Sequence, residues 1–347
     1  MHVLVTGHTG FKGAWLSLLL ASRGHEVTGI ALDPLRGGLF EAADVASVMR
    51  DDIRLDIRDT SGLAYAIGAT GADLVLHLAA QPLVRESYLD PRTTFETNVN
   101  GTLNVLEAIA GVPATKAAVI ITTDKVYRNV GQRPGYVESD ALGGDDPYSS
   151  SKAMADILTH SWTKSFPGVP TAVARGGNVI GGGDVSKDRL LVDLVRGFAM
   201  SEPVRIRYPD AVRPWQHVLD CLSGYLTVAD ALLRGGGTGA WNFGPDPDSF
   251  QTVRQIADAG AALWGGDAGW IDDQGVHPHE AALLTLDSAK AKRELGWANA
   301  LPFPGSLEWT IEWEREVRNG VDAREITLAQ IERYVALARD ASWLRGF

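Results

Sequence analysis

The apolar residues in the first half of the chain are grouped in short runs that alternate with longer amphipathic stretches. Runs of strand length occupy residues 2–6, 26–33, 53–59, 72–81, 117–123 and 171–175. Between several of these runs the apolar positions recur at helical spacing, as at residues 14–21, 94–110 and 148–164. This alternation predicts an α/β fold in which helices cover both faces of a doubly wound parallel sheet.

The alternation breaks down after about residue 180, where short elements with several tryptophans and prolines follow one another. We expect residues 1–180 to form the sheet domain, with a further contribution from about 215–245, because residues 240–243 have the pattern of a returning strand. Residues 181–347 would then form mainly a smaller mixed α/β lobe over the carboxyl edge of the sheet. Its last part, about 306–344, has the pattern of two helices.

A glycine-rich turn joins the first predicted strand to the first predicted helix. Gly7, Gly10 and Gly13 follow residues 2–6 directly. Gly7 permits a tight turn, Gly10 lets phosphates approach the backbone, and Gly13 lets the helix pack closely on the strand. The turn therefore favours a Rossmann-type domain with a dinucleotide pyrophosphate at the helix N-terminus, and a purely structural turn is the alternative. The expected cofactor contacts are Gly7, Thr9, Gly10, Phe11, Lys12 and Gly13.

An acidic residue near the end of the second strand would indicate which nicotinamide dinucleotide is bound. Asp33 lies 20 residues beyond Gly13, a distance that suits a carboxylate on the adenosine ribose hydroxyls and favours NAD. By strand register this acid is expected nearer Ala31, and Arg36 is close enough to keep NADP open. Asp33 is our predicted ribose ligand, and an ordinary aspartate at the start of a loop is the alternative.

Other strand ends are predicted to border the cofactor. Asp56 and Ile57 lie at the third strand, where such a pair commonly flanks adenine, although an aspartate cap for the next helix is equally compatible. The fourth strand ends in small residues, which leave room for a cofactor at the carboxyl end of a parallel strand. The contacts expected from the fourth and fifth strands are Leu78, Ala79, Ala80 and Thr122.

Tyr148 and Lys152 are four residues apart on one predicted helix and so share a face. A lysine ammonium beside a phenol favours the phenolate and is expected to lower the pKa of the tyrosine. Such a phenol can take a proton from an alcohol while hydride leaves the carbon. Thr123, at the end of a strand, would place a hydroxyl on the same substrate oxygen. An exposed helical pair is the alternative, because this spacing is common by chance.

These motifs together resemble the extended short-chain dehydrogenase/reductase superfamily, and more closely its nucleotide-sugar 4,6-dehydratase branch. The similar stretches are residues 5–13, 122–127, 146–149, 177–184, 213–218, 241–245 and 327–334, spread over nearly the whole chain. The resemblance implies a Rossmann domain that holds NAD, with Tyr148 and Lys152 also contacting the cofactor, and a nucleotide-diphosphate sugar beside it.

The resemblance also implies a reaction in three steps. Tyr148, as phenolate, takes the proton of the sugar C4 hydroxyl while hydride passes from C4 to NAD. Water then leaves across C5 and C6, with Asp124 implied as the acid at the C6 oxygen and Lys125 as the base at C5. Finally hydride returns from the reduced cofactor to C6 and a proton returns to C5. The alternatives are that Lys125 only binds the keto oxygen or a carboxylate, and that Asp124 only caps a helix.

The expected substrate is CDP-glucose, because relatives that act on dTDP-glucose have Glu at the position of Lys125, whereas the group that acts on CDP-glucose has Lys. Arg213 resembles the arginine that holds the diphosphate through charge-assisted bonds. Arg189 is expected at the nucleotide or the second phosphate, and Asn178 at a phosphate or sugar oxygen. Gln81 and Arg85 are expected at the sugar, with a loop surface as the alternative. A residue such as His217, set among apolar neighbours, is more often part of a core. The full set of expected substrate contacts is Gln81, Arg85, Asn178, Arg189, Arg213 and His217.

The composition of the chain limits the kinds of molecule that the protein is expected to bind. The net charge is −11 and no Lys/Arg block occurs, which argues against nucleic acid. No apolar run reaches the roughly 18 residues of a membrane span, and no leader segment precedes the first strand, so we expect a cytoplasmic protein. The single cysteine, Cys221, excludes a disulfide framework and a cysteine zinc site within one chain. No metal site is expected, since His277 and His279 are isolated.

The assembly and the reaction each have an open alternative. Many relatives pair through the helices that correspond to residues 94–110 and 148–164, so a homodimer is expected. Another nucleotide-sugar dehydratase, or a 4-epimerase or reductase of the same superfamily, is the alternative activity, and the last two would need neither Asp124 nor Lys125. A cofactor-binding regulator without turnover is a third possibility, and the intact Thr123, Tyr148 and Lys152 argue against it.

Overall fold

Residues 1–132, 135–275 and 283–347, which the computed structural model describes, build a central parallel sheet of seven strands. The strand order is β10-β6-β5-β4-β1-β2-β3, and every neighbouring pair is parallel. The strands are β1 (His2–Thr6), β2 (Glu26–Ala31), β3 (Asp51–Arg54), β4 (Leu74–His77), β5 (Ala117–Thr123), β6 (Thr171–Gly176) and β10 (Gly239–Phe243). The order reverses between β1 and β4, which makes the sheet doubly wound, as predicted. Sheets of this kind bind ligands at their carboxyl edge beside the point of reversal.

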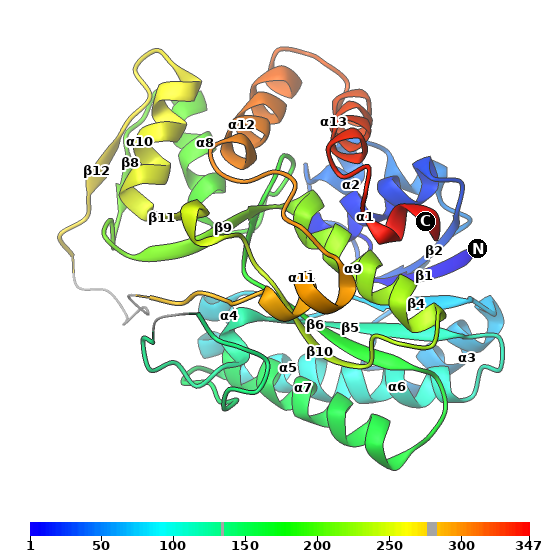
Figure 1. Cartoon of the computed structure of the whole chain (residues 1–347). Helices are drawn as coiled ribbons and strands as arrows, with labels where there is room; N and C mark the ends of the chain where they lie inside the picture. Colours follow the sequence, from blue (N-terminus) through cyan, green and yellow to red (C-terminus); the bar gives the residue numbers. More distant parts are fainter. Residues whose placement is uncertain (133–134, 276–282) are drawn as a thin grey trace.

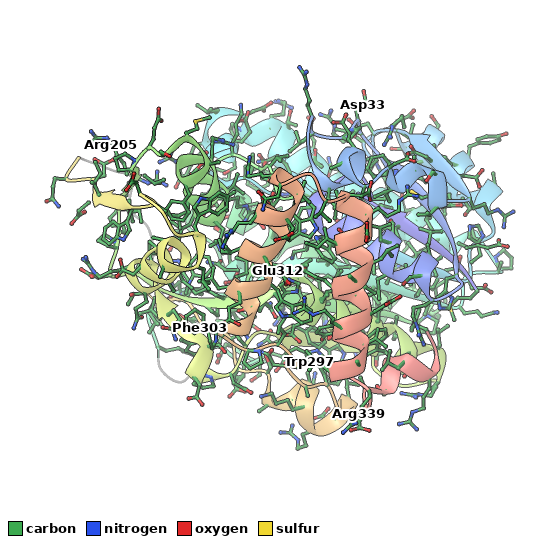
Figure 2. The ribbon with its side chains drawn as sticks, turned by 90° about the horizontal axis from the view of Figure 1, so that it is seen from above. Asp33, Arg205, Trp297, Phe303, Glu312 and Arg339 are labelled. Atoms are coloured by element: carbon green, nitrogen blue, oxygen red, sulfur yellow. The ribbon has the colours of Figure 1, made fainter. Side chains whose placement is uncertain are left out.

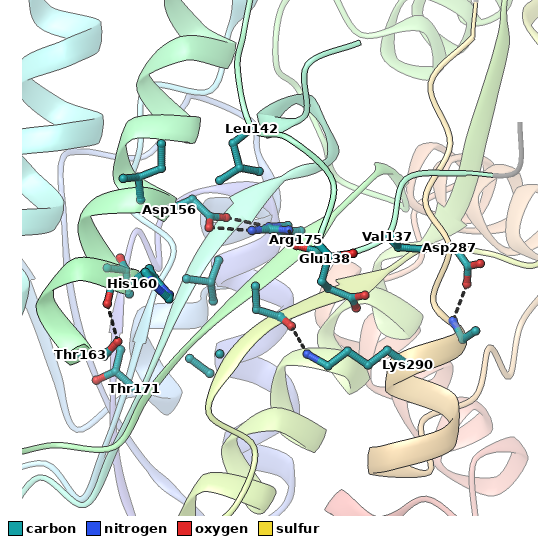
Figure 3. Close-up of a pocket in the computed structure, with 18 of the residues that line it drawn as sticks. Val137, Glu138, Leu142, Asp156, His160, Thr163, Thr171, Arg175, Asp287 and Lys290 are labelled. Carbon is teal, nitrogen blue, oxygen red and sulfur yellow. Dashed lines mark hydrogen bonds and ion pairs between the residues drawn. The ribbon is translucent and has the colours of Figure 1, made fainter. Parts of the chain in front are cut away.

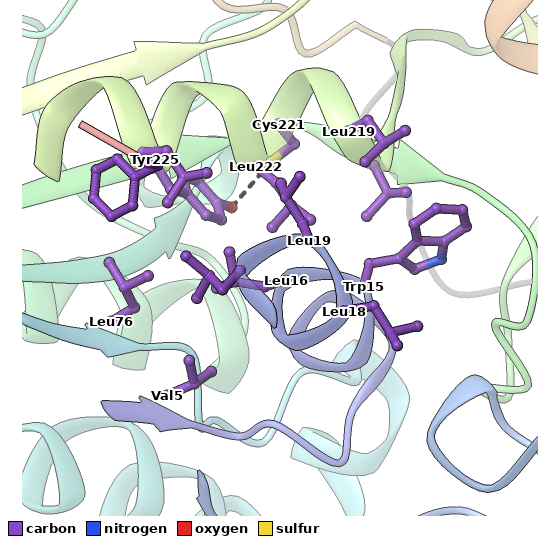
Figure 4. Packing of buried hydrophobic residues seen from close by; sticks show 14 of the residues in the cluster. Val5, Trp15, Leu16, Leu18, Leu19, Leu76, Leu219, Cys221, Leu222 and Tyr225 are labelled. Carbon is purple, nitrogen blue, oxygen red and sulfur yellow. Dashed lines mark hydrogen bonds between the residues drawn. The ribbon is translucent and has the colours of Figure 1, made fainter. Parts of the chain in front are cut away.

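Alternate residues of each strand face two different cores. Val3 and Val5 of β1 pack with α1 (Phe11–Ser22) and α9 (Val218–Leu233), and Figure 4 shows these two helices in contact. Leu4 packs on the opposite face, which is covered by the helices α3 (Thr60–Thr70), α6 (Gly101–Ala110) and α7 (Pro147–Ser165). Because both faces are buried, the strands are apolar at nearly every position and form the continuous runs seen in the sequence.

The start of α7 is fixed by a capping box. The Asp146 carboxylate accepts from the Ser149 backbone N–H at 2.9 Å, the Ser149 hydroxyl contacts the Asp146 backbone nitrogen at 3.2 Å, and Pro147 occupies the first helical position. Tyr148 therefore stands in the first turn, at the carboxyl edge of the sheet. The helix predicted over residues 94–110 is instead three joined pieces: α5 (Pro91–Phe95), a π-helical turn (Glu96–Asn100) and α6.

A second group of elements lies above the sheet in Figure 1. A three-stranded sheet has the order β11-β9-β7, with β9 antiparallel to β11 and parallel to β7. A two-stranded sheet, α8 and α10 complete this mixed lobe. Its elements are β7 (Asn178–Ile180), α8 (Leu190–Met200), β8 (Val204–Ile206), β9 (Val212–His217), β11 (Phe250–Thr252), α10 (Val253–Trp264) and β12 (Trp270–Asp272).

The C-terminal helices close over the first core. Helices α12 (Gly305–Arg318) and α13 (Ala323–Leu337) lie side by side in Figure 2, and α11 (Ala289–Leu295) packs on α9. One buried carboxylate joins this region to α9, since Asp220 accepts from the N–H of Ala300 at 2.8 Å and of Leu301 at 3.1 Å, and from the Tyr334 hydroxyl at 2.8 Å. Burial raises the pKa of Asp220 to about 6.

The remaining elements are short, and some bounds differ from the predictions. They comprise α2 (Leu39–Ala42), α4 (Val84–Leu89) and 3₁₀ turns at Val45–Val48, Asp124–Val126, Pro247–Ser249 and Ser342–Arg345. Strand β3 ends at Arg54 rather than at residue 59, and β4 ends at His77, so residues 78–81 follow it in a loop. Within the described ranges no helix combines the length and apolar character that a membrane crossing needs.

Candidate active site

The glycine turn has the close approaches that its spacing predicts. Gly7 has a φ of +76°, and a Cβ at this position would lie 2.7 Å from the backbone nitrogen of Ala79. A Cβ at Gly13 would lie 2.2 Å from the Gly7 carbonyl oxygen. Both positions therefore exclude a side chain, the first by conformation and contact with the loop after β4, the second by the packing of α1 on the turn.

The first turn of α1 offers a place for a pyrophosphate. Gly10 is the N-cap, and no side chain caps this helix, so the N–H groups of its first turn are available to an anion. A Cβ at Gly10 would meet only the Gly7 carbonyl, at 3.4 Å, which leaves the space beside the turn open. The half-buried Lys12 donates from its amine to the Tyr225 hydroxyl at 3.2 Å. A nicotinamide dinucleotide fits this cradle.

Two further residues of the turn, Thr9 and Phe11, fix it to its surroundings. The Thr9 hydroxyl donates to the Leu32 carbonyl at 2.9 Å, which joins the turn to the end of β2. The Phe11 ring packs against Gly181, where an added Cβ would approach the ring to 3.1 Å. Their predicted contacts with a cofactor would thus come from residues whose side chains already hold the shape of the turn.

A polar cluster lies at the ends of β2 and β3, where the ribose was predicted. The Asp33 side chain is 90% exposed, 3.6 Å from the Arg54 guanidinium, and Figure 2 shows it at the rim of the molecule. Arg54 also pairs with Asp52 at 2.8 Å, and Asp52 contacts the buried ring of His8 at 2.7 Å. Sequence reasoning missed His8, Asp52 and Arg54. The glycine opposite the His8 ring, Gly29, was the available signal, because a Cβ there would lie 2.2 Å from that ring.

The residues predicted around adenine have mixed positions. Asp56 pairs with Arg58 at 2.6 Å, and hydrogen bonding from Arg58 holds the pKa of this carboxyl below its ordinary value. Ile57 is buried and packs against Gly101 of α6. Residues 78–80 are half-buried in the loop beyond β4, which leaves them accessible to a ligand. The Thr122 hydroxyl, in contrast, donates to a carboxylate of α7 at 3.2 Å and faces that helix.

Tyr148, Thr123 and Asp124 meet at the carboxyl end of β5. All three are buried, and the Tyr148 phenol is hydrogen-bonded to Thr123, whose hydroxyl donates to the Asp124 carboxylate at 2.8 Å. Burial raises the pKa of Tyr148, while the charge of Arg189 and the bond to Thr123 act in the opposite direction. The structure thus joins the predicted proton acceptor to the predicted dehydration acid through one hydroxyl.

The Lys152 amine donates to the Ile121 carbonyl of β5 at 2.8 Å and is almost completely buried. Burial, and after it the charge of Lys12, lower the pKa of Lys152 to about 8, while Asp156 acts in the opposite direction. The amine points at the backbone of β5, and the two residues share the predicted helix face. Burial leaves the pKa of Tyr148 above its ordinary value overall, so the lowering expected from Lys152 does not prevail in this structure.

Asp124 and Lys125 lie side by side in the short turn after β5. Asp124 is 1% exposed, and its Oδ2 has no hydrogen-bond partner among the described residues, although Gly177 lies nearby. The Lys125 side chain is 33% exposed, and its amine lies 3.5 Å from Asp124 Oδ1. This contact is the one expected if Lys125 binds a carboxylate, so its role as a base stays a prediction.

The two residues predicted at the sugar from the loop after β4 are already engaged. The Gln81 amide donates to the Leu83 carbonyl at 3.1 Å and to the Thr94 hydroxyl at 2.8 Å, and accepts from the Leu83 N–H at 2.6 Å. Gln81 therefore shapes its own loop, and its amide is not turned to a ligand. Arg85 pairs with Asp188 at 2.8 Å, which joins the α4 region to the segment before α8.

Three of the predicted substrate residues belong to the second lobe. Asn178 begins β7 beside β9, the strand that carries Arg213. Arg213 is half-buried and donates to the Val212 carbonyl at 3.0 Å. Arg189 is exposed at the start of α8, near enough to Tyr148 for its charge to act on the pKa of the phenol. Their contacts with a nucleotide sugar stay predictions.

His217 lies in the protein core and has no access to a substrate. Its side chain is completely buried and makes edge-to-face contacts with Trp15 and Trp309. Burial lowers its pKa to about 3, and its Nδ1 accepts from the Leu219 N–H at 3.3 Å at the start of α9. The structure thus corrects the prediction of a substrate contact and supports the core role typical of a histidine among apolar neighbours.

Sequence reasoning also missed a buried polar network behind the predicted catalytic residues. Arg175 of β6 pairs with Asp156 of α7 at 2.8 Å and donates to the Tyr127 hydroxyl at 2.6 Å. The signal for Asp156 was its spacing, because it follows Lys152 by four residues and so continues the face that carries Tyr148. Nothing in the sequence pairs it with Arg175, which lies on another element.

Neither possible metal ligands nor cavities indicate a second catalytic site among the described residues. No group of three or more His, Cys, Asp or Glu suited to a metal occurs in the residues that were placed, and His277 and His279 lie outside them. A cavity of about 790 Å³ runs between α7, β6, β10 and α11, and none of the predicted catalytic residues lines it. Cys221 is a free, buried thiol in the first core.

Comparisons with known proteins agree on one family. The model of the NAD dependent epimerase/dehydratase family matches residues 3–244. The CDP-glucose 4,6-dehydratase of Salmonella typhimurium is 44% identical over 96% of this chain and 96% of its own length. The dTDP-glucose 4,6-dehydratase of Streptomyces griseus is 31% identical over 92% of this chain and 95% of its own.

Solved structures share the fold. A dTDP-glucose 4,6-dehydratase from Streptomyces venezuelae with NAD bound superposes with a TM-score of 0.78 at 25% identity, covering 92% of this chain and 98% of that one. A Thermus thermophilus UDP-glucose 4-epimerase complex with NAD gives a TM-score of 0.78 at 24% identity, covering 91% and 99%. With a glycine cradle, a Thr123–Tyr148–Lys152 group at the sheet edge and these relatives, the chain belongs to the NAD dependent epimerase/dehydratase family.

Proposed function

We propose that this protein is a CDP-glucose 4,6-dehydratase, which converts CDP-D-glucose to CDP-4-keto-6-deoxy-D-glucose with NAD regenerated in each cycle. One observation carries this choice within the family. The buried Asp124 carboxylate is joined through the Thr123 hydroxyl to the Tyr148 phenol, and the Lys125 amine lies beside it at 3.5 Å. The residue that accepts the C4 hydroxyl proton while NAD oxidises C4, and the residues that remove water from C5 and C6, would thus act on one hexose.

The cofactor would lie on the glycine turn, with its pyrophosphate at the N-terminus of α1. Gly7, Gly10 and Gly13 leave the space that it needs, and Lys12 and Lys152 are the buried or half-buried cations beside it. When bound, NAD supplies a hydride acceptor for C4 and a hydride donor for C6. The exposed Asp33 is the proposed ligand of the adenosine ribose.

Oxidation at C4 requires a proton acceptor, and Tyr148 is placed for this task. As phenolate it takes the proton of the C4 hydroxyl, and the Thr123 hydroxyl beside it supports the same oxygen. Lys152 supplies positive charge behind the phenol at the β5 backbone. The 4-keto group that forms makes the C5 proton acidic, which prepares the elimination.

Elimination requires a base at C5 and an acid at the C6 oxygen. Asp124 Oδ2 has no partner in the described chain. In its protonated form the Asp124 carboxyl would give its proton to the C6 hydroxyl, which then leaves as water. Lys125, in its neutral form, is the proposed base that removes the C5 proton. If Lys125 only holds the keto oxygen or Asp124, a different group must accept that proton.

The two lobes would bind different ligands. We assign the cofactor to residues 1–180, with residues 215–245 contributing β10 at the edge of the sheet, and the nucleotide sugar mainly to residues 181–347. Support comes from the pairing of β10 with β6 and from the cations Arg189 and Arg213 in the second lobe. Guanidinium groups suit a diphosphate because they bind its oxygens with charge-assisted bonds.

We further propose a cytoplasmic homodimer that pairs through α5, α6 and α7. Support comes from apolar side chains left exposed on α4 and α7, namely Tyr88, Leu89, Met154 and Ile157. Met154 also lines a hollow of about 390 Å³, together with Arg92, Phe95 and Val99. Exposed apolar side chains gathered in one place are typical of a protein interface.

A single incubation tests the activity. Purified protein is mixed with CDP-glucose without added reductant, and the product is identified by mass and by its NMR spectrum. A dehydratase gives the 4-keto-6-deoxy sugar nucleotide. An isomeric sugar nucleotide of unchanged mass would indicate an epimerase instead, and unchanged CDP-glucose would contradict the proposal. Parallel incubations with dTDP-, UDP- and GDP-glucose test the preference for the cytosine base.

A further inference from the structure

A single buried guanidinium, that of Arg175, contacts both of the segments that carry the proposed chemistry. Arg175 is 3% exposed and lies on β6, where it pairs in register with Thr122, one residue before Thr123. Its Nε and Nη2 donate to the two oxygens of Asp156, each at 2.8 Å. Figure 3 shows this fork-like pair spanning from the sheet to α7.

The first contact of Arg175 is with α7, the helix that carries Tyr148 and Lys152, which we call the redox pair. Asp156 lies one turn beyond Lys152 on α7 and accepts from the Thr122 hydroxyl at 3.2 Å. The charge of Asp156 also acts on Lys152, whose pKa it raises against the effect of burial. Asp156 therefore fixes the rotation of α7 on β5 and β6, and with it the direction of the face that carries Tyr148 and Lys152.

The second contact of Arg175 is with the segment after β5, which carries Asp124 and Lys125, the dehydration pair. Arg175 Nη1 donates to the Tyr127 hydroxyl at 2.6 Å, and Tyr127 ends the short turn formed by Asp124–Val126. The same hydroxyl donates to Asn242 of β10 at 2.7 Å, and the Tyr127 ring stacks on Tyr136. The tyrosine is 1% exposed, so its hydroxyl has a defined position from which to anchor the turn.

We propose that Arg175 is a positioning residue that sets the spacing between the redox pair on α7 and the dehydration pair after β5, with Asp156 and Tyr127 as its two contacts. This inference rests on the proposed dehydratase function, in which both pairs act on one hexose. The spacing matters because a displacement of about 1 Å between reacting groups can cost on the order of 100-fold in rate. A buried, bidentate ion pair is suited to hold such a distance.

The test measures the two halves of the reaction separately in one turnover. Enzyme loaded with NAD is mixed rapidly with CDP-glucose, and the absorbance of reduced nicotinamide is followed. Its rise reports oxidation at C4, and its decay reports elimination with return of hydride to C6. Rate constants of the two phases are independent of the fraction of folded protein, so partial unfolding of a variant does not disturb the comparison.

Tyr127→Phe removes only the hydroxyl that joins Arg175 to the dehydration segment. We expect the rise to stay within about 2-fold of the unaltered protein and the decay to slow by about 10-fold or more. Asp156→Asn weakens the other contact, so the rise should slow and the decay should change less. Loss of the Asp156 charge should also move the alkaline limb of the rise to lower pH.

Tyr334→Phe is the matched control. Tyr334 is another fully buried tyrosine, and its hydroxyl bonds Asp220 at 2.8 Å and Ser223 at 2.9 Å, away from both catalytic pairs. This variant should leave both phases unchanged. Equal slowing of both phases by Tyr127→Phe, no slowing of either, or the same pattern in Tyr334→Phe would overturn the positioning role. Absence of any rise and decay in the unaltered protein would instead contradict the proposed function.

Discussion

The protonation of two buried residues governs the first step of the proposed reaction. Burial raises the pKa of Tyr148 and lowers that of Lys152, because each ionised form loses water when it is enclosed. Arg189 and Thr123 are two groups that favour an ionised phenol. The helical spacing of Tyr148 and Lys152 thus places them on one face, while their protonation depends on other elements.

The pH dependence of the first step should report Lys152. Its pKa is about 8, and a lysine carries its charge below its pKa, so the protonated form is present below pH 8 and is lost above it. We expect kcat/KM for CDP-glucose to fall as the pH rises through about 8. Lys12→Met, which removes a charge that lowers this pKa, should move the fall to higher pH. A profile that stays level up to about pH 10 would show that the charge of Lys152 is not required.

Substitution of Lys125 decides between its two roles. If Lys125 is the base at C5, Lys125→Met should slow elimination by about 100- to 10,000-fold, while oxidation at C4 continues and reduced nicotinamide accumulates. Lys164→Met, which alters an exposed lysine in the last turn of α7, serves as the control and should leave turnover unchanged. Near-normal turnover by Lys125→Met would assign Lys125 to binding and leave the base to be found elsewhere.

The predictable part of the site is the part that short spacing defines. Three glycines before a helix and a tyrosine four residues before a lysine could be read from the chain, because each set lies within one turn or one helix. His217 was misplaced because its neighbours, Trp15 and Trp309, come from distant segments. For the same reason the pairing of Asp156 with Arg175 could not be predicted, since it depends on how α7 lies on β6.

At the scale of elements, the parallel strands were predictable because burial on both faces leaves a continuous apolar run. Strand β5 has the predicted bounds, whereas β3 and β4 are shorter than their apolar runs. The π-helical turn at Glu96–Asn100 was not predictable, because the apolar spacing continues through it. There Asn98 donates to the Gln81 carbonyl at 3.1 Å and to the Ser151 hydroxyl at 2.8 Å, so tertiary contacts accompany the local change in helix.

One carboxylate between α9 and α13 should make stability depend on pH. Burial raises the pKa of Asp220 to about 6 from an ordinary value of 3.8, so its contribution is fully present below pH 3.8 and is lost as the pH rises through 6. Between these limits the free energy of unfolding should fall by up to about 3 kcal/mol relative to Asp220→Asn. Urea unfolding of both proteins at several pH values measures the difference. Asp248→Asn, an exposed control, should not alter the pH dependence, and parallel curves for Asp220→Asn would contradict the account.

At the scale of the whole molecule, the central question is whether the chain pairs through α7. Ile157 is 53% exposed on this helix, and Ile157→Glu should prevent pairing because it places a charge in an apolar interface. Light scattering should then give the mass of a dimer for the unaltered protein and of a monomer for the variant. Leu337→Glu, which alters a residue 54% exposed on α13, should remain a dimer. A monomer mass for the unaltered protein would refute the proposed assembly.

The arrangement of the two lobes joins the proposed cofactor site to the proposed sugar site. The chain leaves the sheet after β6, builds β7 to β9 of the second lobe, and returns to the sheet as β10. The carboxyl ends of β5 and β6 thus lie beside segments of both lobes. This position fits a reaction in which C4 of the hexose first loses hydride to the cofactor and C6 of the same hexose later receives it.

The central claim is that hydride removed from C4 returns to C6 of the same sugar after water has left. The most direct measurement uses CDP-glucose that carries deuterium at C4, with the product examined by NMR and mass spectrometry. Our account predicts a 4-keto-6-deoxy product in which the deuterium has moved to C6. Deuterium that remains at C4 of an isomeric sugar, or that is absent from the product, would contradict it.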